Sequence, residues 1–78
     1  MTNYEIVAAE PGELADHCAG NWSTDAVGSD NEFATIEDAR EGIANLRALG
    51  EEWAAATYAV REIGQLWPEV GTIDKPMT

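Results

Sequence analysis

The chain has few cations, a single cysteine and no long hydrophobic run. Four Lys and Arg residues stand against fifteen Asp and Glu residues, which gives a formal net charge of −11 over 78 residues. DNA and anionic lipid both repel such a surface, so we expect direct binding to neither. Cys18 has no second cysteine with which to form an internal disulfide. No uncharged stretch approaches the roughly 18–20 residues of a membrane span.

The first residues lack the basic region and the apolar run of a signal peptide. The compartment expected from these absences is the cytoplasm, where a single cysteine stays reduced. Hydrophobic residues make up 45% of the chain, so it is not a disordered acidic tail. We predict one compact domain over residues 1–64 and an irregular C-terminal tail over residues 65–78, where Pro68, Gly71 and Pro76 leave no periodic pattern.

No motif for catalysis or metal binding is present. In Asp16-His17-Cys18, adjacent helical side chains would point about 100° apart, so they cannot act together as nucleophile, base and orienting group. A zinc site would need a second pair of ligands, and the chain has no other His or Cys. Asp25, Asp30 and Glu32 lie around Gly28, but they lack the alternating spacing of a calcium loop. We therefore predict no enzymatic activity, no metal and no cofactor.

The first half of the chain favours short strands. Tyr4, Ile6 and Ala8 alternate with neighbours of the other face, which is typical of a strand with one buried side. A short helix is expected over residues 11–19 and a second strand over residues 22–27. Residues 28–31 have turn chemistry and residues 32–34 begin a return strand.

The clearest predicted element is a helix that begins after Thr35 and ends before Gly50. Thr35 is a good N-cap, and Asp38 follows three residues later. Gly42 weakens the middle of this helix by about 1 kcal/mol relative to Ala. The apolar stripe of the helix consists of Ile36, Ala39, Ile43 and Leu46.

A further helical turn is expected over residues 51–56 and a last strand over residues 58–63. The resulting α+β order, β-α-β-β-α-β, is the ferredoxin-like arrangement around a small antiparallel sheet. If the first helix is absent, a ββαβ sheet with a single packed helix remains. Trp22 and Trp53 are expected in the core, whereas Trp67 is the tryptophan best placed to anchor an interface.

Negative charge is concentrated in the first half of the chain. Residues 1–41 contain ten acids and one base, Arg40, a net charge of −9 (ten minus one). Residues 42–78 contain five acids and three bases, a net charge of −2. Such a concentration of negative charge either keeps a small protein soluble through one hydrated face or binds a positively charged partner. The residues predicted to contact a partner are Glu32, Glu37, Asp38 and Glu41, with Asp25 and Asp30 in support.

Several segments resemble small proteins of phages and prophages, namely residues 4–6, 31–39, 46–53 and 58–60 (YEI, NEFATIEDA, LRALGEEW and YAV). In size, acidity and α+β build the chain is similar to anti-CRISPR proteins that block type I surveillance complexes. Several of those proteins imitate duplex DNA and occupy the basic surface that reads the protospacer-adjacent motif (PAM). The resemblance spans residues 4–63 and implies occlusion of a binding site without chemistry. It assigns no functional residue, so the predicted contact residues rest on the charge pattern alone. We call them the predicted strip: Asp25, Asp30, Glu32, Glu37, Asp38 and Glu41.

The expected function is therefore that of a monomeric, non-enzymatic inhibitor in an infected or lysogenic bacterial host. Its acidic surface would block the positively charged DNA- and PAM-binding site of a type I CRISPR surveillance complex. One alternative is a small structural or accessory phage protein that pairs through a sheet edge or through Trp67. Another is a DNA-mimic inhibitor of a different DNA-binding protein. This hypothesis shares every sequence feature with the hypothesis of a CRISPR inhibitor.

Overall fold

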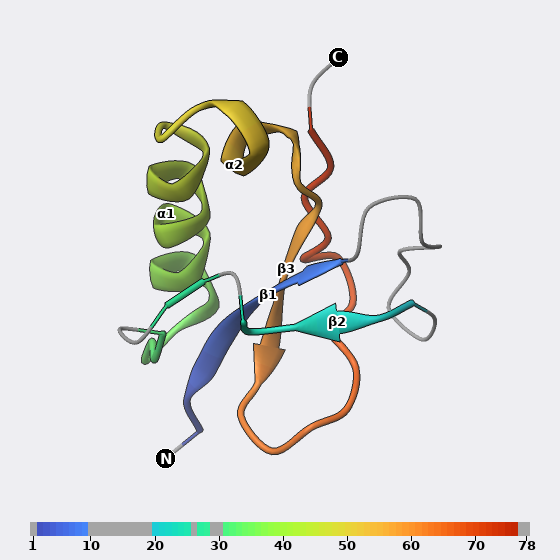
Figure 1. The fold of residues 1–78 in the computed structure, drawn as a ribbon. Coiled ribbons are helices and arrows are strands. Elements are labelled where there is room, and N and C mark those ends of the chain that lie inside the picture. Colours follow the sequence, from blue (N-terminus) through green and yellow to red (C-terminus); the bar gives the residue numbers. More distant parts are fainter. Residues whose placement is uncertain (1, 10–19, 26, 29–30, 77–78) are drawn as a thin grey trace.

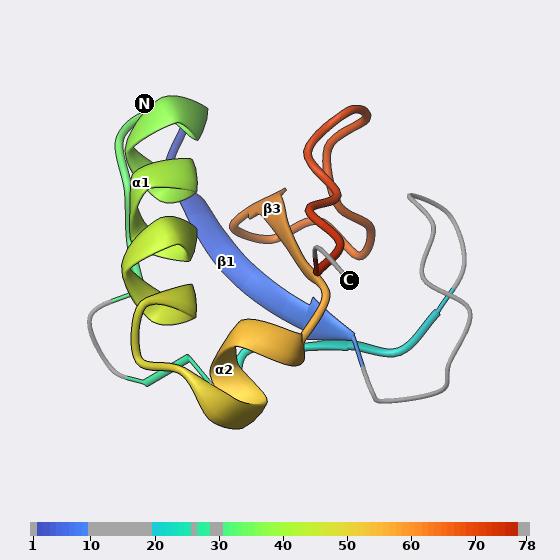
Figure 2. The same ribbon diagram turned by 90° about the horizontal axis from the view of Figure 1, so that it is seen from above.

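The fold is given by a computed structural model that describes residues 2–9, 20–25, 27–28 and 31–76. In chain order the elements are strand β1 (Tyr4–Ala9), strand β2 (Trp22–Ser23), helix α1 (Ile36–Arg47), helix α2 (Glu51–Ala55) and strand β3 (Tyr58–Glu62). The three strands form an antiparallel sheet in the order β2-β1-β3. Helix α1 lies on one side of this sheet, and the C-terminal segment lies beyond β3 from it (Figures 1 and 2). The predicted α+β class with a small antiparallel sheet is confirmed.

The core forms between α1 and the two long strands. Strand β1 pairs with β3 so that Ile6 lies opposite Val60 and Ala8 lies opposite Tyr58. These four residues share a sheet face, because side chains two apart in a strand point the same way. They form one buried cluster with two residues of α1, and the members are Ile6, Ala8, Ala39, Ile43, Tyr58 and Val60. On the opposite face Val7 and Ala59 are also fully buried, so both faces of the central pairing are covered.

Helix α1 begins and packs as the sequence predicts. The Thr35 side chain accepts a hydrogen bond from the Asp38 N–H at 3.1 Å, which confirms the N-cap. Gly42 faces the sheet, and a Cβ atom there would lie only 2.9 Å from Ile6 Cδ1 and 3.0 Å from Phe33 Cζ. The close approach of α1 to β1 therefore explains a glycine that helix propensity alone disfavours.

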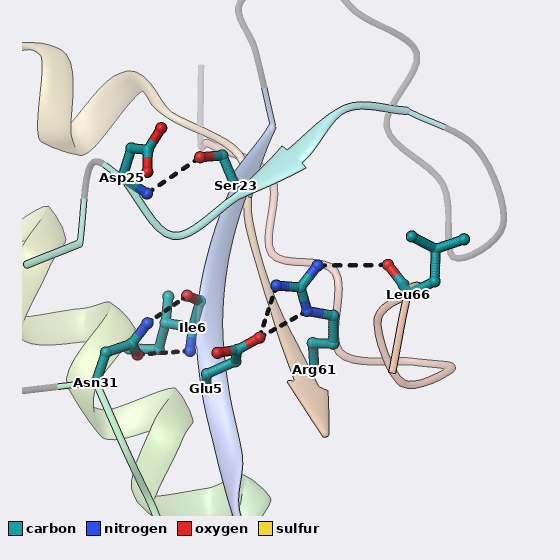
Figure 3. A network of polar contacts seen from close by, with 7 residues as sticks. All are labelled: Glu5, Ile6, Ser23, Asp25, Asn31, Arg61 and Leu66. Atoms are coloured by element: carbon teal, nitrogen blue, oxygen red, sulfur yellow. Dashed lines mark hydrogen bonds and ion pairs between the residues drawn. The ribbon is translucent and has the colours of Figure 1, made fainter. Parts of the chain in front are cut away.

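The outer edge of β1 is closed at three places by two pieces of chain, strand β2 and residues 31–33. Ser23 and Trp22 of β2 pair with its C-terminal end, and Phe33 exchanges two backbone hydrogen bonds of 2.8 Å with Tyr4. Between them the Asn31 side chain accepts from the Ile6 N–H at 2.7 Å and donates to the Ile6 carbonyl at 2.8 Å (Figure 3). One amide side chain thus makes the two bonds that a neighbouring strand residue would make.

This arrangement corrects two predicted strands. The strand expected over residues 22–27 is limited to Trp22–Ser23, and the return strand expected at 32–34 is a single bridge between Phe33 and Tyr4. Because the Asn31 side chain closes the gap, no continuous third strand is needed there. The helix expected over residues 11–19 lies outside the described residues. The described elements therefore do not confirm the β-α-β-β-α-β order.

The C-terminal segment closes the outer edge of β3. Tyr58 and Asp74 exchange backbone hydrogen bonds of 2.9 and 2.7 Å. The buried Thr72 hydroxyl accepts from the Val60 N–H at 3.2 Å and donates to the Glu69 carbonyl at 2.7 Å. Residues 65–76 contain no helix or strand, as expected of an irregular segment, yet these bonds tie them to the sheet. The domain boundary at residue 64 stays a prediction.

Candidate acidic interface

Three carboxylates project from the outer face of α1. Glu37, Asp38 and Glu41 are exposed, whereas Ala39 and Ile43 of the same helix are fully buried. At about 100° per residue, Glu41 lies opposite the buried stripe, with Glu37 and Asp38 on either side of it. The three side chains span about 6 Å of helix axis, because each residue rises about 1.5 Å. The predicted helical period therefore places these acids together, away from the core.

Glu32 extends this group at the start of the helix. It follows Asn31, which is fixed on β1, and precedes Phe33, whose ring lies against the Gly42 position of α1. The exposed Glu32 carboxylate accepts a hydrogen bond from the side-chain amide of Asn3. We call the group Glu32, Glu37, Asp38 and Glu41 the acidic face.

Asp25, one of the two supporting acids of the predicted strip, does not join the acidic face. Asp25 is exposed in the turn after β2, where its N–H donates to Ser23 Oγ at 3.1 Å (Figure 3). Strand β2 pairs with Ala8 and Ala9, whereas the chain beside Glu32 pairs with Tyr4. Four residues of strand separate these points by about 13 Å. Asp30 lies outside the described residues.

Two arginines of α1 turn away from the acidic face toward the C-terminal segment. Arg40 donates to the Gly71 carbonyl at 3.2 Å. Arg47 donates to the Asp74 carbonyl at 2.7 Å, pairs with the Asp74 carboxylate at 3.2 Å and also reaches the Ala54 carbonyl at 2.7 Å. The positive charges of α1 therefore hold the fold together and leave the carboxylates of the acidic face without an ion pair among the described residues.

The third arginine behaves in the same way. Arg61 of β3 pairs with Glu5 of β1 at 2.6 Å, and both side chains are only 16% exposed. Its guanidinium also donates to the Leu66 carbonyl at 3.4 Å (Figure 3). Each arginine thus contacts residues 66–74. Sequence reasoning counted these cations but missed their use, because the partners lie up to 56 residues away along the chain.

Arg47 also packs on the core. Its guanidinium carbon lies 5.0 Å from the centre of the Tyr58 ring, at the distance of a cation–π contact. The Tyr58 hydroxyl donates to the Trp53 carbonyl at 2.7 Å. Burial raises the pKa of Tyr58, and the nearby Arg47 charge opposes that rise. These contacts assign Arg47 to the fold and not to a partner site.

The described part of the chain holds no group of three or more Asp and Glu side chains that could bind a metal ion, and His17 and Cys18 lie outside it. None of its helices is long and apolar enough to cross a bilayer. No protein-family model matches the chain, and no curated protein or solved structure is significantly similar to it. We therefore argue function from the acidic face and from the placement of the arginines.

Proposed function

We propose that this protein is a non-enzymatic inhibitor that presents its acidic face to the positively charged DNA-binding site of another protein. One observation supports this most directly. The carboxylates of α1 point outward without cationic partners among the described residues, while Arg40 and Arg47 on the same helix are turned to the C-terminal segment. An ordinary surface mixes charges of both signs, which steadies its helices. Segregation of this kind suits a surface that meets positive charge.

The charge density of the acidic face supports imitation of DNA. Duplex DNA carries about one phosphate charge per 1.7 Å of helix axis. Three carboxylates over about 6 Å of α1 come within a factor of about two of that density. Because the carboxylates stand on a packed helix, little backbone entropy is lost when they meet a binding site. Electrostatic attraction would speed association and make affinity fall with salt.

The target that we propose is the DNA- and PAM-binding surface of a type I CRISPR surveillance complex. This choice comes from the resemblance to anti-CRISPR proteins, and it implies a monomer acting in the cytoplasm of an infected or lysogenic bacterium. A different DNA-binding protein, such as a restriction enzyme, polymerase or repressor, would accept the same acidic face.

Competition for DNA tests this function. A labelled duplex bound to a purified type I surveillance complex is titrated with the protein at low and high salt. We expect displacement of the duplex that weakens as salt rises. The variant Glu37→Lys/Glu41→Lys should displace at least about tenfold less well, which corresponds to about 1.4 kcal/mol of binding free energy.

A matched variant controls for net charge. Glu51→Lys/Glu52→Lys makes the same charge change at two exposed positions of α2, outside the acidic face. It should compete nearly as well as the wild-type protein, and circular dichroism should show both variants folded. Equal loss in both variants would contradict the assignment to the acidic face. Absence of displacement at either salt would remove this target.

Of the alternatives, the accessory role through a free edge of β1 or β3 has less support. The outer edges of β1 and β3 are closed by the chain itself, through Asn31 and Phe33 on one side and Thr72 and Asp74 on the other. The version that acts through Trp67 is favoured by the 40% exposure of that side chain. Binding that ignores salt and is lost on Trp67→Ala would identify it.

The finer fold order also stays a prediction. It requires residues 11–19 to be helical, and backbone chemical shifts across that segment would decide between β-α-β-β-α-β and a ββαβ core.

A further inference from the structure

The loop that follows β3 carries an unusual share of exposed apolar side chains. We call residues 63–70 the apolar loop. Among the described residues, the only exposed large hydrophobic side chain outside it is Leu49, at 63%. Single exposed apolar residues are ordinary, whereas a cluster marks an interaction surface. The exposed apolar side chains of the loop are Ile63 at 45%, Leu66 at 69%, Trp67 at 40% and Val70 at 76%.

The backbone of the apolar loop is held at both ends. At its start the Ile63 N–H donates to the Asn3 carbonyl at 3.0 Å. In its middle Arg61 donates to the Leu66 carbonyl while pairing with Glu5, so the loop is connected to the sheet (Figure 3).

The end of the loop is fixed as firmly. The Glu69 N–H donates to the Val60 carbonyl at 2.8 Å, and the Glu69 carbonyl accepts from the Thr72 hydroxyl at 2.7 Å. Pro68, within the loop, is buried. A loop fixed in this way presents its apolar side chains with little ordering cost on binding.

Asn3 joins the apolar loop to the acidic face. Its carbonyl accepts from Ile63 at the start of the loop, and its side-chain amide donates to Glu32 of the acidic face. One residue of the acidic face, Glu32, is therefore linked through Asn3 to the start of the loop. A partner that contacts Glu32 at this end of the β1–β3 pair would also lie beside the start of the loop.

We propose that the apolar loop is a second contact with the same partner, docking into an apolar pocket rimmed by Lys and Arg; this rests on the proposed function. The charges in and around the loop favour one kind of binding partner. Glu62 precedes the loop, Glu69 lies within it, and Arg61 beside it is already paired with Glu5. A second copy would bring another net charge of −11 against the first, and anionic lipid would be repelled in the same way. A basic protein surface is the complementary occupant.

The two surfaces have different kinetic roles. Exposed carboxylates steer the encounter and act on the association rate. Buried aromatic and aliphatic anchors act mainly on the dissociation rate, and Trp is enriched among such anchors. We therefore expect substitutions in the apolar loop to raise the dissociation rate, an effect that a change of salt concentration should not reproduce.

Binding kinetics with a purified type I surveillance complex test the proposal. We expect Leu66→Ala/Trp67→Ala to dissociate at least about tenfold faster, with an association rate and a salt dependence close to those of the wild type. Leu49→Ala serves as the matched control for Leu66→Ala, because the two leucines are 63% and 69% exposed. The single Leu66→Ala variant removes only an exposed side chain, so it gives a readout even if loss of Trp67 disturbs folding.

The outcomes distinguish failure of the apolar loop alone from failure of the proposed function. If Leu66→Ala/Trp67→Ala dissociates at the wild-type rate while Glu37→Lys/Glu41→Lys associates more slowly, the proposed role of the apolar loop is overturned. The proposed function then still stands. Absence of binding by the wild-type protein would overturn both. Self-association that Leu66→Ala abolishes, measured by sedimentation, would identify a second copy as the occupant and overturn the basic partner.

Discussion

The outer face of α1 and the seam between β3 and the C-terminal segment use charge in opposite ways. On α1, Glu37 and Glu41 are exposed and make no ion pair with the described residues. The seam comprises residues 66–74 and the groups that hold them. There Asp74 pairs with Arg47, and Arg61 pairs with Glu5 of the neighbouring strand β1. The chain thus contains structural carboxylates and free carboxylates. Changing the first kind should alter stability, and changing the second should alter binding.

The largest effect is expected on breaking the Arg61–Glu5 pair. Arg61→Met leaves the Glu5 carboxylate, only 16% exposed, without its cation and also frees the Leu66 carbonyl. We expect a loss of about 3 kcal/mol in the free energy of unfolding, near the low end for buried pairs because some solvent reaches this one. A domain of this length has about 4–12 kcal/mol in total. Urea denaturation followed by tryptophan fluorescence measures the change.

Two further variants sharpen this prediction. Lys75→Met removes the same charge from an exposed position and should change stability little. Glu5→Gln/Arg61→Met removes both charges and should recover part of the loss, since no buried carboxylate is then left alone. A double variant no more stable than Arg61→Met would show that packing of the arginine stem, and not the charge pair, matters there.

Much of α1 and its charged face could be predicted, because the signals are local. Thr35 and Asp38 mark the N-terminus within four residues, and the helical period assigns Glu37, Asp38 and Glu41 to the outside. The return strand predicted at residues 32–34 was wrong, because Asn31 pairs with β1 through two side-chain hydrogen bonds, and no periodicity in the sequence indicates such bonds. The charge pattern placed Asp25 with the other acids, and it could not indicate that Asp25 follows a strand that pairs with Ala8 and Ala9, at the other end of β1 from Glu32.

The seam was less predictable for a related reason. Residues 65–76 lack any repeat, so their order depends on single long-range contacts. The Thr72 hydroxyl fits the Val60 edge, and three arginine side chains find backbone carbonyls in the same segment. Neither kind of contact leaves a spacing signal in the sequence. The exposed Leu66 and Val70 gain meaning only once the loop is seen to be fixed.

An intermediate effect is expected at Thr72. Thr72→Val keeps the shape of the side chain but leaves the Val60 N–H without its partner and removes a donor to the Glu69 carbonyl. We expect a loss of about 2 kcal/mol in the free energy of unfolding, since the hydroxyl is buried at 4% exposure. Thr72→Ser keeps the hydroxyl and should lose less than half as much. Equal losses in the two variants would show that the methyl group, and not the hydrogen bonds, fixes the seam.

The smallest effect, with the opposite sign, is expected at Glu41. Glu37 and Glu41 are four residues apart on α1, where like charges destabilise a helix by about 0.2–0.5 kcal/mol. Glu41→Gln removes this repulsion without touching the first turn, so it should raise the free energy of unfolding by a few tenths of a kcal/mol. Glu37→Gln removes the same repulsion but also loses a favourable contact with the helix dipole, so its net gain should be smaller or absent.

Measurements at low and high salt separate the Glu37–Glu41 repulsion from contributions that salt does not screen. At about 1 M salt the screening length falls to about 3 Å, so the gain from Glu41→Gln should disappear. Denaturation curves at low and high salt measure it. A loss of stability in Glu41→Gln would mean that this carboxylate has a structural partner, which would place it with Glu5 and Asp74 and remove it from the acidic face. A gain in stability combined with weaker competition for DNA would instead show that Glu41 is kept at a cost to the fold, as expected of a residue whose role is to meet positive charge.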